Sequence, residues 1–234
     1  MPLTSFGATV AGPAHLRDGL PNQDAWAHAR VAGGRVVVVA DGMGSKAHAD
    51  IGAQAACRAV PEALRVWSRH PDASTQVLLG LIHLLWRARL GACPPEDAAT
   101  TCLFALLAQE GSGLVGQLGD GLLLIHEGGE VRSLRQRNDS GFSNQTLAMG
   151  VTRKLGAWVV ETLAPGDRTV ILCTDGVADD LLSDKHRDFA EWVEDELVPL
   201  PASTRWRSLA TELRTWPTPH HIDDKTLAVI RSAP

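Results

Sequence analysis

Five aspartates stand where a short apolar run meets a turn, in the contexts PNQD, VVVVADGMG, LVGQLGDG, VILCTDG and HHIDDKTLAVI; they are Asp24, Asp41, Asp120, Asp175 and Asp223. They are spread over almost the whole chain, so only folding can bring them together. An aspartate at the end of a buried strand directs its oxygens into the cleft beside the sheet edge. Carboxylates that converge there repel one another strongly unless a hard divalent cation lies between them. The pattern therefore predicts an oxygen-lined site for Mg²⁺ or Mn²⁺.

Three of these aspartates are followed at once by a glycine: Gly42, Gly121 and Gly176. Glycine lets the backbone approach an ion without obstruction by a side chain. A single Asp-Gly pair is a favoured turn dipeptide and needs no ion to explain it. Three such pairs directly after apolar runs, together with Asp24 and Asp223, favour the metal site over three unrelated turns.

The elements that must position the aspartates are mostly strands. GRVVVVADGMG contains a continuous β-branched run, which is typical of a buried central strand. Residues 5–10 and 25–31 predict weaker strands, and further strands are predicted in TTCLFALLA, GLVGQLGD, GLLLIHEGGEV, APGDRTVILCTDG and KTLAVIRS. GLVGQLGD is joined to the next run by Asp-Gly, and GLLLIHEGGEV contains Gly-Gly; both dipeptides are typical of β-hairpins.

Helices are predicted between these strands. Apolar positions recur at helical spacing from Ala49 to Arg69, although Pro61 inside that run predicts a kink or a break. A second helix is predicted from Ser74 to Leu90, and residues 185–214 predict two helical pieces split by VPLPAST. Residues 132–156 are polar and without clear periodicity, so we expect a flap-like surface segment there. The whole pattern predicts one domain over residues 1–234, with antiparallel sheets and helices outside them.

Composition agrees with one ordinary globular domain, since 44% of the 234 residues are hydrophobic and 21% are charged. A formal net charge of −5 gives no basic footprint for nucleic acid or anionic lipid. We see neither a signal peptide nor an apolar run near the roughly 20 residues of a membrane span. The four cysteines have no C-x-x-C spacing and predict buried free thiols. We therefore expect a cytoplasmic protein.

The ordered motifs NQDAW, VVADGMG, AATTCLFALL, GQLGDGLLLIHEGGEV, LAPGDRTVILCTDGVADDL and DDKTLAVI resemble the metal-dependent protein phosphatases, the type 2C serine/threonine phosphatases, in their compact bacterial form. The resemblance covers roughly residues 5–230. It implies an α+β fold, a four-layer αββα sandwich of two central antiparallel β-sheets flanked by helix pairs. It also implies that phosphoserine and phosphothreonine on proteins are hydrolysed by a water that bridges two Mn²⁺ or Mg²⁺ ions, without a phosphoenzyme. The implied partner is a phosphorylated protein substrate of a serine/threonine kinase, and we expect a monomer.

The resemblance also assigns roles to the aspartates. Asp41 would bridge the two ions, and the carbonyl of Gly42 would ligate one of them. Asp175 and Asp223 would complete the first metal site. Asp24 would lie beside it and orient bound water.

The resemblance implies weaker roles for the fifth aspartate, Asp120, and for Asp224. Asp120 matches the family aspartate linked to a third, weaker metal ion. Asp224 would hydrogen-bond beside Asp223 or act as a weak ligand.

The sequence departs from the family pattern at three positions. Gln23 stands where the family often has a glutamate ligand, and a neutral amide oxygen is a weaker ligand for a hard cation. Gly19 occupies the position of the phosphate-binding arginine, for which Arg17 is the nearest substitute, with His15 on the same loop. Met43 replaces a histidine that is the general acid in some members, and methionine cannot donate a proton.

Substrate selection is assigned to the flap-like segment, where Asn144 is the candidate contact. The three departures leave a second hypothesis open, a catalytically impaired pseudophosphatase that binds phosphoproteins or acts as a regulatory module. A third hypothesis is a phosphatase of small molecules with the same metal site. The first hypothesis rests on the complete set of aspartates.

Overall fold

Two five-stranded antiparallel sheets form the centre of the protein, as the computed structural model shows for residues 3–31, 33–134, 147–152, 154–216 and 222–232. The first sheet has the order β1-β10-β9-β6-β7, with the bounds Thr4–Val10, Lys225–Ser232, Arg168–Cys173, Leu122–Glu127 and Glu130–Leu134. The second has the order β2-β3-β4-β5-β8, with the bounds Asp24–Val31, Gly34–Asp41, Cys102–Ala108, Gly113–Leu118 and Val159–Leu163.

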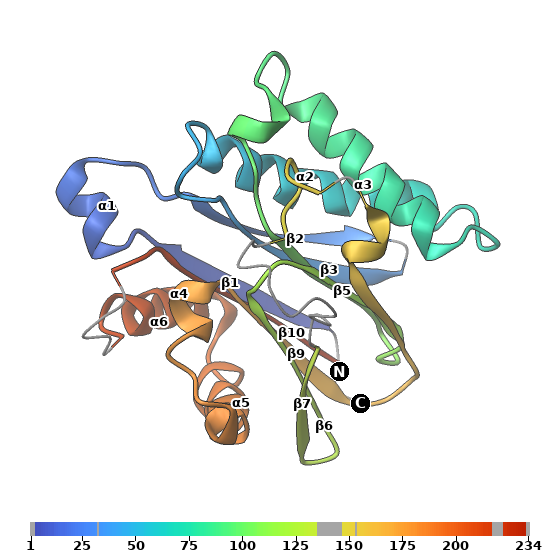
Figure 1. The fold of residues 1–234 in the computed structure, drawn as a ribbon. Coiled ribbons are helices and arrows are strands. Elements are labelled where there is room, and N and C mark those ends of the chain that lie inside the picture. The colour runs from blue at the N-terminus through green and yellow to red at the C-terminus, as the bar shows by residue number, and fades with distance from the viewer. Residues whose placement is uncertain (1–2, 32, 135–146, 153, 217–221, 233–234) are drawn as a thin grey trace.

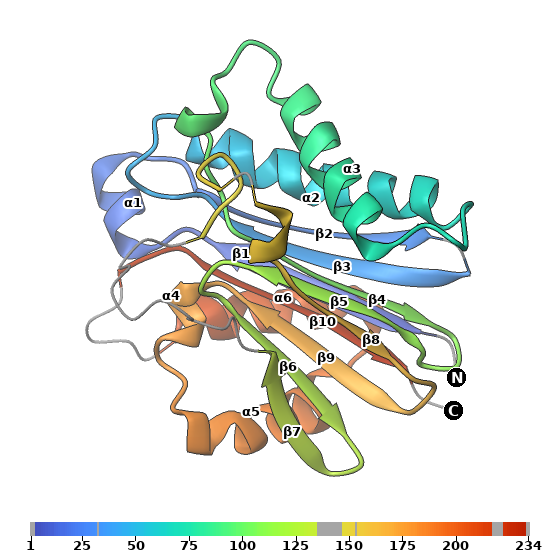
Figure 2. The same ribbon diagram turned by 45° about the vertical axis from the view of Figure 1, so that its right-hand side comes forward.

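Helices cover the outer face of each sheet, as Figures 1 and 2 show. Two long helices, α2 (Ala49–Trp67) and α3 (Thr75–Arg89), pack on the second sheet. The first sheet is covered by α5 (His186–Trp192), the π-helix Val193–Leu197 and α6 (Ala202–Arg214). The predicted four-layer αββα sandwich is confirmed. In the part of the chain that the structure describes, no helix is long and apolar enough to cross a bilayer.

The remaining helices are short. They are α1 (Pro13–Asp18), α4 (Asp175–Ala178) and the 3₁₀ helices Pro95–Asp97, Leu155–Ala157 and Ser183–Lys185. Both α1 and α4 lie at the same end of the sandwich (Figure 2). That end carries the candidate site described below.

Three apolar clusters hold the layers together, one under each helix layer and one between the sheets. The strand β3 explains the continuous VVVV run, because Val36 and Val38 face the helices while Val37 and Val39 face the other sheet. A central strand buried on both faces needs apolar residues at every position. Three of the four free cysteines are buried as predicted, whereas Cys93 is partly exposed.

The predicted kink or break at Pro61 is wrong in its stronger form, because α2 runs as one helix from Ala49 to Trp67. Pro61 lies in the buried stripe of α2 beside Val60 and Leu64. A proline in a helix interior removes one backbone hydrogen bond and clashes with the preceding turn. The apolar contacts of this stripe with the sheet offset that cost.

The predicted hairpin at Asp120-Gly121 is also wrong, because β5 pairs with β4 and β8 while β6 pairs with β7 and β9. The turn therefore carries the chain from one sheet to the other. The buried Gln117 amide holds this crossover by donating to the carbonyls of Gly119 (3.1 Å) and Gly121 (2.6 Å). An Asp-Gly pair encodes a tight turn but not the sheet that each flanking strand joins. The Gly-Gly hairpin between β6 and β7 is confirmed.

Two parts of the segment 132–156, for which composition predicts a flap, belong to the sheet and the core. Residues up to Leu134 belong to β7, and Met149 is fully buried, with its backbone paired to Thr100. Both parts are therefore fixed in the fold. The candidate substrate contact Asn144 lies outside the described residues.

Candidate metal centre

The predicted aspartates converge at one end of the sandwich. Asp24 at the start of β2 lies directly opposite Asp41 at the end of β3. Asp175 begins α4, just after β9 ends, and Asp223 precedes β10, the neighbour of β9. Asp41, Asp120, Asp175 and Asp223 line a pocket of about 190 Å³, which we call the acidic pocket; its other described lining residues are Gln23, Gly42, Met43, Gly44, Ser45 and Thr101.

Carboxylates dominate the acidic pocket, and none of the ten described residues that line it is lysine, arginine or histidine. Burial raises the pKa of Asp41 well above its ordinary value, and the charges of Asp24, Asp175 and Asp223 raise it further. The pKa of Asp175 rises to about 6, first through burial and then through Asp223 and Asp120. A bound divalent cation would relieve this repulsion.

The side chain of Gln23 completes the oxygen set. Its Oε1 atom is buried and has no hydrogen-bond partner among the described residues, although Gln23 lines the acidic pocket. The backbone of Gln23 is fixed, because its N–H donates to Asp224 Oδ2 (2.6 Å) and its carbonyl accepts from Gly42 N (3.1 Å). Carboxylate oxygens and one orphaned amide oxygen are a donor set that suits Mg²⁺ or Mn²⁺. The residues present therefore fit the implied ions.

Two threonines that sequence reasoning missed hold Asp41 in place. The N–H of Asp41 donates to Thr101 Oγ1 (3.0 Å), and its carbonyl accepts from Thr101 N and Thr100 Oγ1 (both 2.8 Å). All the backbone polar groups of Asp41 are thus satisfied by one neighbouring segment, which limits movement of the carboxylate. The available signal was the Thr-Thr pair in AATTCLFALL.

Asp24 lies behind the acidic pocket and not in its wall. The hydroxyl of Thr174, also missed from the sequence, donates to Asp24 Oδ2 at 2.8 Å. Burial raises the pKa of Asp24 to about 8, against the lowering effect of hydrogen bonds from Thr174 and Thr226. The assignment of Asp24 to water orientation stays a prediction.

The glycines after the aspartates are required by backbone packing. A Cβ atom on Gly42 would lie 2.3 Å from the carbonyl oxygen of Ala49 and 2.8 Å from that of Gln23. A Cβ atom on Gly176 would lie 2.0 Å from the carbonyl oxygen of Asp224. Any side chain at these positions would therefore push apart the segments that form the site. Ligation of an ion by the Gly42 carbonyl stays a prediction.

Asp224 joins three segments beside the acidic pocket. Its carboxylate is 2% exposed and accepts hydrogen bonds from Gly12 N (2.7 Å), His15 Nδ1 (2.9 Å) and Gln23 N (2.6 Å). His15, Asp223 and Asp224 each offer a ligand atom within 4.8 Å of the others, but these three bonds occupy Asp224. We therefore assign Asp224 to positioning. His15 is held by Asp224 and does not line the acidic pocket, so its contact with substrate stays a prediction.

The structure does not bring Arg17 to the acidic pocket. Its guanidinium is exposed on α1 and pairs with the neighbouring Asp18, through Nε to Oδ1 (2.8 Å) and a second nitrogen to Oδ2 (3.1 Å). The local cause is a six-residue helix that begins at Pro13 and ends at Asp18; it is followed by Gly19, whose φ of +68° favours glycine. Arg17 is only two positions from Gly19, where the family has its phosphate-binding arginine, but this closeness in sequence did not predict the direction of the Arg17 side chain.

Comparisons with known proteins agree with this geometry. Residues 11–216 match the family model described as protein phosphatase 2C. The structure is similar to PppA, a key regulatory component of T6SS in Pseudomonas aeruginosa (TM-score 0.68, 19% identity, covering 100% of this chain and 99% of that chain). It is also similar to the serine/threonine phosphatase Stp1 from Staphylococcus aureus (TM-score 0.67, 14% identity, 100% and 96% covered) and to RsbX in complex with magnesium (0.61, 14%, 99% and 96%). At these identities the structures show the fold alone. No curated protein sequence matches the chain.

Proposed function

Because this chain belongs to the protein phosphatase 2C family, we propose that it is a Mn²⁺- or Mg²⁺-dependent phosphatase of phosphoserine and phosphothreonine in proteins. The family membership supports protein phosphatase activity in general. The metal dependence and the hydrolytic route are our extension to this chain.

One observation carries the proposal. Four carboxylates, those of Asp41, Asp120, Asp175 and Asp223, line one small pocket, and no described residue in its wall has a cationic side chain. Closely spaced carboxylates destabilise a fold through their mutual repulsion, and a divalent cation bound between them removes that repulsion. The unpartnered Gln23 Oε1 atom supports the same conclusion from a neutral group.

Each residue has a definite task in this proposal. Asp41, Asp175 and Asp223 would hold the principal ions, while Asp120 would hold a third and weaker one. When bound, Mn²⁺ or Mg²⁺ supplies a nucleophilic water near neutral pH and neutralises charge on the phosphoryl group.

Neighbouring groups keep these ligands in place. Thr101 fixes the backbone of Asp41, and Thr174 fixes the carboxyl of Asp24, which we propose orients the attacking water. With Met43 unable to donate a proton, protonation of the leaving serine or threonine oxygen falls to water in the pocket. No phosphoenzyme is needed.

The test is phosphate release from a phosphothreonine peptide in Mn²⁺, Mg²⁺ or EDTA. We expect activity with the cations that disappears in EDTA and in Asp41→Asn, whereas Asp72→Asn, at an exposed carboxylate outside the acidic pocket, behaves as the wild type. Activity that survives both EDTA and Asp41→Asn would refute the proposal. Faster hydrolysis of small phosphate esters than of phosphopeptides would instead favour a small-molecule phosphatase.

A second candidate function follows from the position of Arg17. Since Arg17 pairs with Asp18 and the wall of the acidic pocket offers no arginine, the described residues supply no guanidinium for the substrate phosphate. This favours, as the alternative, a binding module that retains the metal site with little turnover. Calorimetry separates the two: stoichiometric Mn²⁺ binding without phosphate release selects the binding module. Cytoplasmic location and a monomeric state stay predictions.

A further inference from the structure

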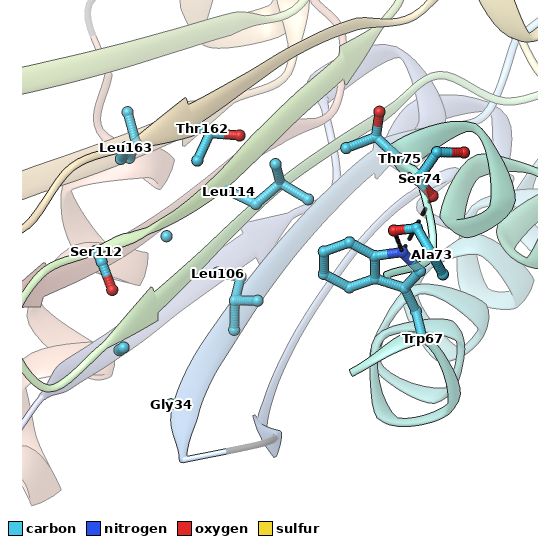
Figure 3. A pocket seen from close by; sticks show the side chains of 12 residues that line it. Gly34, Trp67, Ala73, Ser74, Thr75, Leu106, Ser112, Leu114, Thr162 and Leu163 are labelled. Atoms are coloured by element: carbon cyan, nitrogen blue, oxygen red, sulfur yellow. Dashed lines mark hydrogen bonds between the residues drawn. The ribbon is translucent and has the colours of Figure 1, made fainter. Parts of the chain in front are cut away.

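A second hollow lies at the opposite end of β3 from the acidic pocket. It has a volume of about 500 Å³, and we call it the apolar cavity; its lining residues are Gly34, Trp67, Ala73, Ser74, Thr75, Leu106, Ala108, Ser112, Gly113, Leu114, Thr162 and Leu163. It forms where the end of α2 and the turn into α3 leave part of the outer face of the second sheet uncovered (Figure 3). The strand β3 begins in this cavity at Gly34 and ends in the acidic pocket at Asp41.

The walls of the apolar cavity are fixed by the fold. Trp67 Nε1 donates to the carbonyl oxygens of Ala73 (3.0 Å) and Ser74 (3.1 Å), which clamps the turn between α2 and α3. These hydrogen bonds use the only polar atom of the Trp67 side chain. The apolar part of its ring points from α2 toward Leu106 and Leu114 (Figure 3). The cavity therefore does not need a ligand to form, and binding would cost little reorganisation.

The floor of the cavity is a row across three paired strands. Leu106 on β4 lies opposite Leu114 on β5, which lies opposite Thr162 on β8. Leu114 is only 4% exposed, so an occupant has to enter the hollow to touch it. The flat surface of a partner protein does not reach such a floor, whereas a small molecule does.

The lining chemistry defines the class of ligand. None of the twelve lining residues carries a charged side chain, so an ionised ligand would lose its hydration without gaining a counter-charge. Apart from the Ser112 hydroxyl, which bonds to Glu110, the hydroxyls in the wall belong to Ser74, Thr75 and Thr162. Ser74 precedes α3 without capping it through its side chain, so its hydroxyl stays available to a ligand.

We propose that the apolar cavity is a binding site for a neutral, mostly apolar small molecule with one hydrogen-bonding group placed toward Ser74 and Thr75. Its volume lies within the roughly 300–1,000 Å³ of small-molecule sites in proteins. Water in such a hollow finds few polar partners, so replacing it by an apolar body is favourable. The site is separate from the acidic pocket and shares no residue with it.

The test uses N-phenyl-1-naphthylamine, a neutral apolar dye that fluoresces more strongly when it leaves water. We expect saturable binding of one dye per chain. Thr162→Trp places a large ring in the cavity from the exposed edge strand β8 and should weaken binding about tenfold or more, whereas Thr211→Trp, an equal change on the exposed face of α6, should not. Ser112→Phe fills the cavity from the turn between β4 and β5, and it replaces Thr162→Trp as the test variant if Thr162→Trp does not fold.

Two results would overturn the inference. One is a failure at the cavity itself: no saturable dye binding to the folded wild type, or cavity-filling variants that bind the dye as tightly as the wild type does. The other is displacement of the dye by Mn²⁺ with inorganic phosphate, which would assign the dye to the acidic pocket. Dye binding that is unchanged by Mn²⁺ and phosphate supports a separate site.

Discussion

Replacing Asp24 by asparagine should stabilise the protein in EDTA at neutral pH, although Asp24 belongs to the NQD motif beside the candidate site. Burial raises the pKa of Asp24 from 3.8 to about 8. Between these two values the unfolded chain ionises this group while the folded chain keeps it protonated. The contribution of Asp24 to stability is therefore lost progressively as pH rises from about 4 to about 8.

The size of this effect follows from the shift. One pKa unit corresponds to about 1.4 kcal/mol, so the 3.7 units between pH 3.8 and pH 7.5 set an upper limit of roughly 5 kcal/mol. Asparagine has nearly the same shape, carries no charge and still accepts the Thr174 hydrogen bond through its oxygen. We expect Asp24→Asn to raise the free energy of unfolding by about 2–5 kcal/mol at pH 7.5 and by almost nothing near pH 4.

Urea unfolding in EDTA at pH 4.5, 6.0 and 7.5 measures this difference. Asp72→Asn, at an exposed position, is the matched control and should change stability little at any of these pH values. If Asp24→Asn is no more stable than the wild type at pH 7.5, the buried carboxylate is compensated in the metal-free protein and the argument from its burial fails. In Mn²⁺ the same variant should lose phosphatase activity, which separates the stability effect from the functional one.

Three further predictions concern the metal, the Asp224 cluster and the cysteines. Mn²⁺ at 100 times its Kd should raise the free energy of unfolding by about 2.7 kcal/mol in the wild type and hardly at all in Asp41→Asn, measured by urea unfolding; an equal gain in both proteins would argue against a site at Asp41. Asp224→Ala leaves the N–H groups of Gly12 and Gln23 unpaired and should cost about 2–4 kcal/mol, and a loss below about 0.5 kcal/mol would show that water replaces the carboxylate. A thiol reagent at pH 8 should label Cys93 alone in the folded protein, because Cys93 is partly exposed whereas Cys57, Cys102 and Cys173 are buried, and mass spectrometry of the labelled peptides would reveal any other site.

Much of the fold could be predicted because its central strands, such as β3 and β9, are buried on both faces. The apolar runs of β3 and β9 end at Asp41 and just before Asp175, so a strand-end position for both aspartates followed from local sequence. Ordered motifs then supplied the layer arrangement through the family resemblance. Both sources depend on residues that are neighbours in the chain.

The features that could not be predicted depend on partners distant in the sequence or on the direction of a side chain. The role of Asp224 is set by Gly12, His15 and Gln23, which lie 212, 209 and 201 positions away. The hairpin error at Asp120 has the same origin, since strand partners are chosen by packing of the whole sheet. The direction of the Arg17 side chain could not be predicted either, because it depends on the short helix α1 that carries it.

The large separation in sequence between Asp224 and its hydrogen-bond partners also determines when the acidic pocket can form during synthesis. The strand β10 inserts between β1 and β9, and Asp224, which directly precedes it, fastens the segments around Gly12 and Gln23. During synthesis, β1, β2 and β3 are made long before β10. Until β10 is made, β1 lacks its neighbour in the first sheet, and Gln23, which precedes β2, lacks its hydrogen bond to Asp224. Such non-local pairing is slow to form. The acidic pocket therefore cannot be completed until Asp224 and β10 have been made, however early the strands β1, β2 and β3 are available.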